Sequence, residues 1–514
     1  MSKRSNDFKT RSEDKRVATL DSSIVSQYTG YFPPHKDTKI DVIDLPSTAE
    51  AINSFYENYV IARKPCKIKG VCFREILLEG LSPANINSTL PGDEILQVER
   101  KVDGGFGSGE KRLKMSFEEF MNKVVNDGND LYLTTQYVED DPDQEEESFS
   151  DEGNDSEEEE APEGFADLSD AESLNFNDAH DDFEELNGSD EDDSIVAELC
   201  TGSLTTQEAE QRIKELYQPP MTNLVKRLPE TPKFLASLIP QQINLWIGSA
   251  SSTTTNDVFL NNFDATKPKL GLGRNVPGEG SSSGLHHDHA DNIYIPINGH
   301  KRFTLFSPGD AAKMYTVGDL RKVFDSGVID YVRNGAAPSW RMLRDDGAVI
   351  AEVAKQKLES HDTLSEDKKQ ELLRIIEADE SDLQEIDAHT DPPSFSNIPP
   401  SVVHLDKIKD SPLKTEIEAA AIKKWPLFFD ANRITVDLHP GEMLFLPTGW
   451  FHEVTSFGNA KKSIPEDKLH IAVNYWFIPP NGKSISNLYP HEDRYWPLDY
   501  DRTKIALSRA RLET

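Results

Sequence analysis

The sequence predicts a mainly β protein with flanking helices and long insertions, and three observations point to this fold class. Only 36% of the residues are hydrophobic, so part of the chain is expected to lie outside a packed core. Helical spacing of apolar residues is confined to a few segments. Four stretches rich in branched and aromatic residues are typical of buried strands, namely "QQINLWIG" (241–248), "NIYIPINGHKRFTLF" (292–306), "ITVDLHPGEMLFLPTGWFHEVTS" (434–456) and "KLHIAVNYWFIPP" (468–480).

The chain begins with a polar segment, and we expect residues 1–30 to form a disordered tail. Residues 31–138 are expected to form the N-terminal part of the fold. Within it, Ser47–Val71 predicts a capped helix followed by a short strand that ends at a glycine. Lys114–Val125 predicts a second helix with a serine cap, and Asp130–Val138 predicts a strand.

An acidic segment interrupts this pattern over residues 139–198. From Glu139 to Glu198 there are 28 Asp and Glu and no Lys or Arg, and removing them from the net charge of −36 leaves −8 for the rest of the chain. Such a segment cannot bury enough apolar surface to offset its chain entropy, so we expect a disordered insertion. It is either a solvated spacer or a docking arm for basic partners such as histones or ribosomal proteins.

Order is expected to return over residues 199–480, which form the main domain. The Gly- and Ser-rich residues 249–282 predict an inserted loop, and the segment at about 345–395 predicts a helical insertion. Within the latter, Ala351–Ile386 predicts a helical hairpin on the surface. Residues 481–514 form a C-terminal extension, for which a helix is one option.

Composition excludes several other classes of protein. The three cysteines, Cys66, Cys72 and Cys200, contain no CxxC pair and give neither a disulfide framework nor a thiolate zinc site. No apolar run approaches about 18 residues, so no membrane span is expected. The N-terminus lacks the apolar core of a secretory signal. These observations predict a protein of the cytoplasm, the nucleus or both.

The stretch "GLHHDHAD" (284–291) carries the first part of a candidate site. In an extended segment residues i and i+2 point to the same side, so His286 and Asp288 converge, while His287 and His289 form the opposite pair. A histidine and a carboxylate at this spacing supply two ligands of the 2-His-1-carboxylate triad that binds Fe(II). Alone this spacing is a weak signal, because a capped loop also explains it.

The residues that follow strengthen this interpretation. Asn298–Gly299 is a strong signal for a two-residue hairpin turn between the strands on either side. With that pairing, Asn292, Tyr294 and Lys301 would share one face of a sheet. A lysine buried beside a metal is costly unless an anion meets it. A dicarboxylate co-substrate would supply that anion.

The third ligand is expected on another strand. "PGEMLFLPTGWFHEV" (440–454) predicts a turn, a buried strand and a second turn that presents His452. A histidine near an aromatic residue is also a common hydrogen-bonded core residue. His439, His470 and His491 are rival candidates, but none of them follows such a strand and turn.

Together these pieces resemble the JmjC-domain, cupin-type Fe(II)/2-oxoglutarate oxygenases. The resemblance is greatest to the small JmjC-only hydroxylases, the group that contains the asparaginyl hydroxylase inhibiting hypoxia-inducible factor. It implies a double-stranded β-helix (jelly-roll) core with flanking helices, in which residues 199–480 form the catalytic core. The matching segments, in the family's order, are "YVIARKPCKIKGV", "INLWIG", "SSSGLHHDHADNIYIPINGHKRFTLFSP", "HPGEMLFLPTGWFHEV" and "LHIAVNYWF".

The resemblance also implies roles for individual residues. His286, Asp288 and His452 match the family's metal ligands, which form the catalytic centre. Lys301 matches the lysine that pairs with the distal carboxylate of 2-oxoglutarate.

Other pocket residues match the family less specifically. Ser283 lies where the family often has a co-substrate-binding Thr or Ser. Asn292 and Asn474 match polar residues that position the co-substrate, and Tyr294 is a further contact that rests on the hairpin argument alone.

The implied chemistry is hydroxylation of a substrate C–H bond with Fe(II), 2-oxoglutarate and O2, with release of succinate and CO2. A protein side chain is the first expected substrate, and the acidic segment would suit a basic protein. Histone lysine demethylation and hydroxylation of a modified tRNA base are alternatives on the same fold, although the sequence has no evident basic stripe for nucleic acid. A non-catalytic scaffold that displays the acidic arm is an alternative of another class. Relatives of this kind often form homodimers through C-terminal helices.

Overall fold

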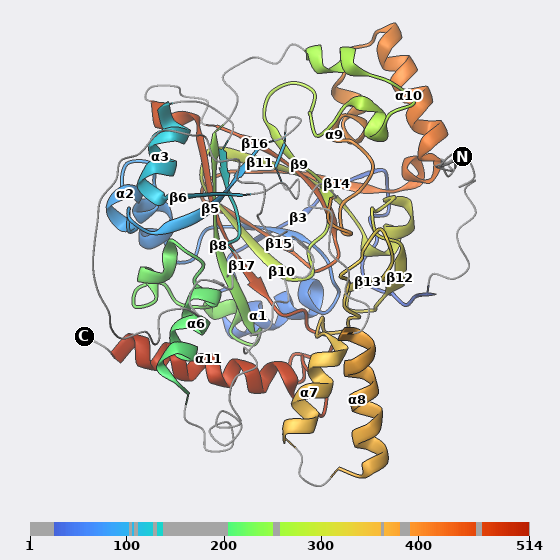
Figure 1. Ribbon diagram of the computed structural model, residues 1–514. Coiled ribbons are helices and arrows are strands. Elements are labelled where there is room, and N and C mark those ends of the chain that lie inside the picture. The colour runs from blue at the N-terminus through green and yellow to red at the C-terminus, as the bar shows by residue number, and fades with distance from the viewer. Residues whose placement is uncertain are drawn as a thin grey trace, which may run out of the picture.

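The computed structural model describes residues 25–101, 105–106, 112–126, 131–136, 204–249, 257–360, 364–380, 391–458 and 465–512 (Figure 1). The acidic insertion expected at 139–198 lies outside the described residues, as do the first 24 residues of the expected tail.

Two sheets dominate the fold, and apolar side chains from both fill the space between them. The larger sheet has nine strands in the order β3 (Asp41–Asp44), β4 (Cys66–Lys69), β15 (Glu442–Leu446), β10 (Asp291–Asn298), β17 (Leu469–Phe477), β8 (Pro240–Ser249), β7 (Leu131–Leu133), β5 (Ile95–Arg100) and β6 (Leu113–Ser116). The smaller sheet has five strands in the order β2 (Asp37–Thr38), β14 (Arg433–Leu438), β11 (His300–Phe306), β16 (Phe451–Phe457) and β9 (Ser281–His286).

From β8 to β17 the chain passes back and forth between these sheets. Strands β8, β10, β15 and β17 lie together in the larger sheet, and β9, β11, β14 and β16 form most of the smaller one. This winding is the double-stranded β-helix, so the predicted fold class is confirmed.

The predicted hairpin at Asn298–Gly299 is wrong. Strand β10 pairs with β15 and β17, whereas β11 pairs with β14 and β16, so the two strands are not hydrogen-bonded to each other. The Asn298–Gly299 turn instead carries the chain from one sheet to the other, with Gly299 in the left-handed region at φ 70°. Asn292, Tyr294 and Lys301 still face the same interior, because each sheet turns alternate residues inward.

The helices cover the outer faces of the sandwich. Apolar residues of α1, α3, α6 and α11 pack on the outer face of the larger sheet, and those of α9 and α10 belong to a second cluster beside the smaller sheet. The bounds are α1 (Ala49–Phe55), α2 (Ile86–Thr89), α3 (Phe117–Asn126), α6 (Thr206–Leu216), α7 (Ile350–Ser360), α8 (Glu366–Glu380), α9 (Pro400–Val403), α10 (Pro412–Lys424) and α11 (Tyr495–Leu512).

Helices α7 and α8 lie side by side and away from the sheets, as the helical hairpin predicted within the insertion (Figure 1). Asp379 of α8 anchors them, since its carboxylate accepts from Arg333 and Arg341. The C-terminal extension contains α11, which packs against α6 (Figure 1).

The N-terminal part contains the predicted elements with shorter bounds. Thr48, not the neighbouring serine, caps α1, and β4 ends beside Gly70. Ser116 accepts from the backbone N–H of Glu119 at the start of α3. The strand predicted over Asp130–Val138 is limited to β7, and the end of that range lies outside the described residues.

The tail expected over residues 1–30 is ordered in its last part. Val25–Ser26 forms β1, which pairs in parallel with β12 (Leu320–Val323), and β12 pairs with β13 (Ile329–Tyr331). Tyr28 is buried in the second apolar cluster, and Thr29 donates to Asp325. An apolar anchor and a strand partner therefore fix a segment whose polar neighbours suggested disorder.

Within the described residues, no helix combines the length and the apolar character needed to cross a membrane.

Candidate functional site

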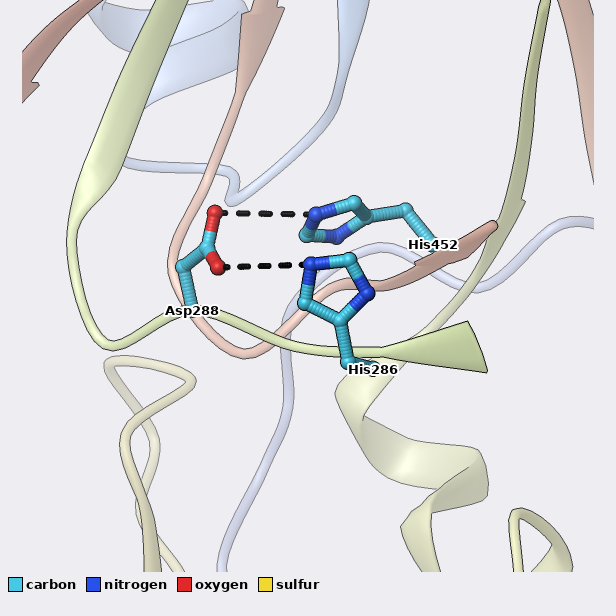
Figure 2. Close-up of side chains that lie close together, drawn as sticks. All are labelled: His286, Asp288 and His452. Atoms are coloured by element: carbon cyan, nitrogen blue, oxygen red, sulfur yellow. Dashed lines mark ion pairs between the residues drawn. The ribbon is translucent and has the colours of Figure 1, made fainter. Parts of the chain in front are cut away.

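Two neighbouring strands of the smaller sheet bring His286 and His452 together. His286 ends β9 and His452 lies near the start of β16, and the two residues are direct partners in the antiparallel register. Their ring centres lie 4.3 Å apart. Asp288, two residues after His286, turns its carboxylate toward both rings (Figure 2).

These three side chains present one compact set of ligand atoms. Asp288 Oδ1 lies 3.8 Å from His286 Nε2, and Asp288 Oδ2 lies 3.6 Å from His452 Nε2. All three ligand atoms lie within 4.8 Å of one another. Two imidazole nitrogens and one carboxylate at this separation fit a 2-His-1-carboxylate metal site.

The other nitrogen of each ring fixes its orientation. His286 Nδ1 lies 3.1 Å from the carbonyl oxygen of Gly284, and His452 Nδ1 lies 2.9 Å from that of Trp450. Because a carbonyl oxygen only accepts, each Nδ1 carries the hydrogen and each Nε2 keeps its lone pair for a metal. Phe395 stacks on the His286 ring at a centroid distance of 4.8 Å and restricts it further.

Burial also keeps His286 in the form that a metal requires. It lowers the pKa of His286 well below the usual 6.5, and the neighbouring His452 lowers it further. Neutral imidazole is therefore the resting form of this side chain at physiological pH.

His287 and His289 point to the other side, as the alternation predicts. His287 Nε2 lies 2.6 Å from the hydroxyl of Tyr331, and His289 Nε2 lies 2.8 Å from the carbonyl oxygen of Ile329. Both histidines are buried against aromatic rings there, which include Trp340. They form a core behind the candidate site and are not part of the ligand set.

Lys301 lies inside the sandwich with 2% of its surface exposed. Its Nζ lies 2.6 Å from Ser456 Oγ, 3.2 Å from Tyr132 Oη and 3.4 Å from His470 Nδ1. Among the residues that the structure describes, no carboxylate pairs with this amine. Burial, together with nearby Lys101, lowers the pKa of Lys301 from 10.5 to about 7. An anion entering this interior would restore the charged form.

The asparagines expected in the pocket lie side by side between the sheets. Asn474 Nδ2 donates to Asn292 Oδ1 at 3.2 Å, and Trp246 Nε1 donates to Asn474 Oδ1 at 2.7 Å. Tyr294 is the strand partner of Asn474, and its ring centre lies 5.9 Å from Lys301 Nζ. The two amides and this lysine therefore line the same interior.

Comparison with known proteins agrees with this architecture. A family model described as a cupin-like domain matches residues 52–483 of the chain. The chain belongs to this cupin-like, JmjC-type family. Members of the family typically depend on Fe(II) and 2-oxoglutarate. The particular resemblance to the asparaginyl hydroxylase group stays a prediction.

Two relatives show how far the similarity extends. The chain is 28% identical over 525 residues to "JmjC domain-containing protein 4" of Schizosaccharomyces pombe, covering 92% of this chain and 91% of the relative. It is 24% identical over 240 residues to "Lysine-specific demethylase JMJ32" of Arabidopsis thaliana, covering 46% of this chain and 42% of the relative.

In this JmjC-type domain, Ser283 lies beside the ligand set, and its hydroxyl is hydrogen-bonded to backbone groups. Its Oγ accepts from the Val454 N–H at 3.1 Å and donates to the Gly284 carbonyl oxygen at 2.8 Å. The hydroxyl therefore stabilises the strand pair that carries the histidines, and one of its acceptor positions remains unused by these two bonds.

Several residues of the JmjC interior were not predicted. Tyr132 and Ser456 contact Lys301, and Asn244 is fully buried opposite Asn474 with no hydrogen-bond partner for either of its amide atoms among the described residues. The signal for Asn244 was available, because it is a polar residue between Ile243 and Leu245 and lies on the same side of the strand as Trp246. Tyr132 depends on a strand pairing across a long insertion and left no local signal.

The rival histidines lie elsewhere. His439 stacks on His300 at a centroid distance of 5.2 Å, and His470 lies beside Lys301. His491 lies 2.7 Å from Asp345 in a second group of acidic residues. Arg344 pairs with Asp346 of that group, and His491 lines a separate pocket of about 420 Å³ formed mostly by residues 485–497.

A small cavity of about 50 Å³ opens beside the ligand set, lined in part by Phe106, Trp246, Phe395 and Trp476. Glu99 and Thr135 add polar groups to this wall. Since ligand pockets usually exceed about 300 Å³, a ligand of ordinary size would enter only if side chains of the wall moved.

Proposed function

We propose that this protein is an Fe(II)- and 2-oxoglutarate-dependent oxygenase that hydroxylates a protein side chain and releases succinate and CO2. The observation that carries the proposal is one interior with two complementary features. A 2-His-1-carboxylate set lies toward one end, and a buried lysine lies toward the other, with no carboxylate partner among the residues that the structure describes.

The strand register supports the placement of a short dicarboxylate between these features. On the paired strands β11 and β16, Lys301 is opposite Ser456 and Leu305 is opposite His452. Lys301 and Leu305 are four residues apart, which corresponds to about 13 Å along the strand. The side chains of Lys301 and His452 both point inward, which shortens this gap. The span suits a ligand with a carboxylate at each end.

The residues of the chain then divide the work. His286, Asp288 and His452 would hold the iron, and Lys301 would pair with the distal carboxylate. When bound, the iron would activate O2, which takes two electrons from 2-oxoglutarate as it becomes succinate and CO2 and two from the substrate C–H bond that is hydroxylated.

The remaining pocket residues position the co-substrate. The amides of Asn292 and Asn474 can donate and accept hydrogen bonds in the middle of the interior, and Asn244 offers a further free amide. Ser283 lines the cavity at the ligand set, and Tyr294 lies beside Lys301. Apolar walls keep water away from the reacting atoms.

The first experiment measures succinate formation from 2-oxoglutarate by the purified chain with Fe(II), ascorbate and air. The double variant His286→Ala, Asp288→Ala should abolish turnover, whereas His439→Ala, an exposed histidine outside the interior, should leave it unchanged. Because some such enzymes do not convert 2-oxoglutarate in the absence of their substrate, metal content and 2-oxoglutarate binding are measured on the same samples. A wild-type chain that binds neither would refute the proposal.

Demethylation is a second candidate, because one relative is named a lysine-specific demethylase. Hydroxylation of an N-methyl group gives a product that loses formaldehyde, whereas a hydroxylated carbon side chain gains one oxygen. Formaldehyde release and peptide mass, measured with methylated and unmethylated basic peptides, distinguish the two reactions. The proposed partner is a basic protein of the cytoplasm or nucleus, such as a histone or a ribosomal protein.

A homodimer through α11 is part of the same proposal. Leu498, Ile505 and Leu512 are exposed and spaced by seven residues, so they lie along one face of the helix. Light scattering of the wild-type chain and of Ile505→Glu would test it: a dimer that becomes a monomer supports the pairing, and a wild-type monomer contradicts it.

A further inference from the structure

The two histidine-bearing strands, β9 and β16, are joined through an irregularity just before His286. Thr455 pairs with Ser282 and Glu453 pairs with Leu285, so the register shifts between these pairs and β9 has one residue more than β16. This is a β-bulge, a device that re-aims side chains beside functional sites. Gly284 lies within it at φ 79°, where a glycine is strongly favoured.

A buried carboxylate lies behind this bulge. Glu453 is fully buried on the face of β16 opposite to His452. Ser282 Oγ donates to its Oε1 at 2.6 Å, and His404 Nε2 lies 2.6 Å from its Oε2. Thr455 Oγ1 lies 3.0 and 3.1 Å from the two oxygens. Three side chains therefore satisfy a charge that would otherwise be very costly to bury.

A continuous path runs from this carboxylate to the His286 ring. Glu453 accepts from Ser282 Oγ, and the same oxygen accepts from the Gly284 N–H at 3.0 Å. The carbonyl oxygen of Gly284 then accepts from His286 Nδ1. Glu453 thus fixes the Ser282 hydroxyl, which accepts from the Gly284 N–H. The Gly284 carbonyl oxygen in turn orients the His286 ring.

We propose that Glu453 and His404, acting through Ser282, are positioning residues that hold Gly284 and hence set the orientation of His286 for metal binding. This inference rests on the proposed metal site. None of the three residues belongs to the ligand set, and their side chains lie outside the interior that would receive the co-substrate.

The network contains its own matched control. Ser282 and Thr455 are both fully buried, and each hydroxyl donates to the same carboxylate. Only Ser282 is also bonded to Gly284. A role of Glu453 in stability alone predicts similar effects from Ser282→Ala and Thr455→Val, whereas a positioning role predicts that they differ.

The experiment measures the affinity of the full chain for Co(II) by calorimetry and the thermal midpoint of the metal-free protein. Ser282→Ala should weaken Co(II) binding by about 10- to 100-fold, the usual effect of losing an outer partner of a histidine ligand. Thr455→Val should change the Co(II) affinity by less than about threefold. It should lower the thermal midpoint about as much as Ser282→Ala does. Glu453→Gln, which keeps an acceptor for Ser282, should retain more affinity than Glu453→Leu.

A second readout does not depend on metal. Nitrogen-15 NMR of the labelled histidines in the metal-free protein reports whether His286 carries its hydrogen on Nδ1. Ser282→Ala should reduce that tautomer, and Thr455→Val should not. Equal effects of the two variants on both readouts would overturn the inference. If the wild-type chain binds no Co(II), the proposed function fails, and the NMR comparison still decides the positioning role.

Discussion

Lys301 Nζ lies 3.4 Å from His470 Nδ1 inside the jelly roll, and both side chains are buried. Burial and the two nearby lysines, Lys301 and Lys101, lower the pKa of His470 well below its usual value, so His470 is neutral near pH 7. The pKa of Lys301 itself is about 7. The remaining neighbours, Tyr132 and Ser456, are uncharged. This end of the pocket therefore changes its charge near neutral pH.

The first prediction concerns the pH dependence of 2-oxoglutarate binding. A carboxylate binds the protonated form of Lys301, so affinity should fall above pH 7 by up to about tenfold per pH unit. Binding at pH 8 should take up about one proton. Calorimetry with Ni(II)-loaded protein, in two buffers of different ionisation enthalpy, measures both quantities. An affinity that is flat between pH 6.5 and 9 would contradict the assignment of Lys301.

The second prediction concerns the stability of Lys301→Met without co-substrate. The pKa of Lys301 is lower in the folded protein than in the unfolded chain, so the unfolded state binds more protons between about pH 7 and 10.5. The destabilising effect of the buried amine is therefore complete below pH 7 and disappears as pH rises toward 10.5. Lys301→Met should raise the free energy of unfolding at pH 6.5 by roughly 1–3 kcal/mol, after the loss of its hydrogen bonds.

Urea unfolding of Lys301→Met and wild type at pH 6.5 and 9.5 checks this prediction. The difference between the two proteins should shrink at the higher pH, and the variant should no longer be stabilised by 2-oxoglutarate. A variant that is less stable than wild type at both pH values would indicate that Lys301 is a structural residue.

The third prediction concerns Asn244. Its amide atoms are buried and have no partner among the described residues, which costs about 1–3 kcal/mol. Asn244→Leu should therefore raise the thermal midpoint of the protein without ligands. If the amide binds the co-substrate, 2-oxoglutarate should stabilise the variant less than the wild type. Thermal unfolding with and without 2-oxoglutarate gives both values, and an unchanged ligand shift would exclude Asn244 from the site.

The sequence predicted the ligand set because the signals are local. His286 and Asp288 are two residues apart on one side of a strand, and His452 follows a strand and a turn. The hairpin prediction at Asn298–Gly299 failed because a tight turn has the same sequence pattern whether its two strands pair with each other or belong to different sheets. The inward face was still correct, since alternation along a strand does not depend on its partner.

Apart from Asn244, the residues that were missed depend on long-range pairing. Tyr132 reaches Lys301 only because β7 joins β8 across the acidic insertion, and Glu453 meets Ser282 only because β16 pairs with β9. No spacing along the chain records such contacts. The family resemblance assigned no role to these residues, although Ser282 and Glu453 lie within the matching segments.

The last prediction concerns the buried ion pair between Arg63 and Asp291, which supports the turn before His452. Arg63 Nη1 donates to Asp291 Oδ2 at 2.9 Å, and both side chains are almost wholly buried. Asp291 also accepts from the Thr448 N–H at 2.9 Å, and the Arg63 carbonyl oxygen accepts from Trp450 Nε1 at 3.0 Å. The pair thus links the N-terminal segment to the turn that carries the third candidate ligand.

Asp291→Asn removes one charge and leaves the Arg63 guanidinium buried without its partner. The free energy of unfolding should fall by about 3–5 kcal/mol. Asp437→Asn, which breaks the exposed pair with Arg302, is the matched control and should cost about 1 kcal/mol or less. Urea unfolding measures both.

The same turn should transmit the Asp291→Asn change to the metal site. The Gly449 N–H donates to the Asp288 carbonyl oxygen at 2.9 Å, so the turn also fixes the backbone of a candidate ligand. Co(II) affinity should therefore fall with Asp291→Asn and stay unchanged with Asp437→Asn. Equal stability losses in the two variants would show that the buried Arg63–Asp291 pair contributes no more to stability than an exposed ion pair does.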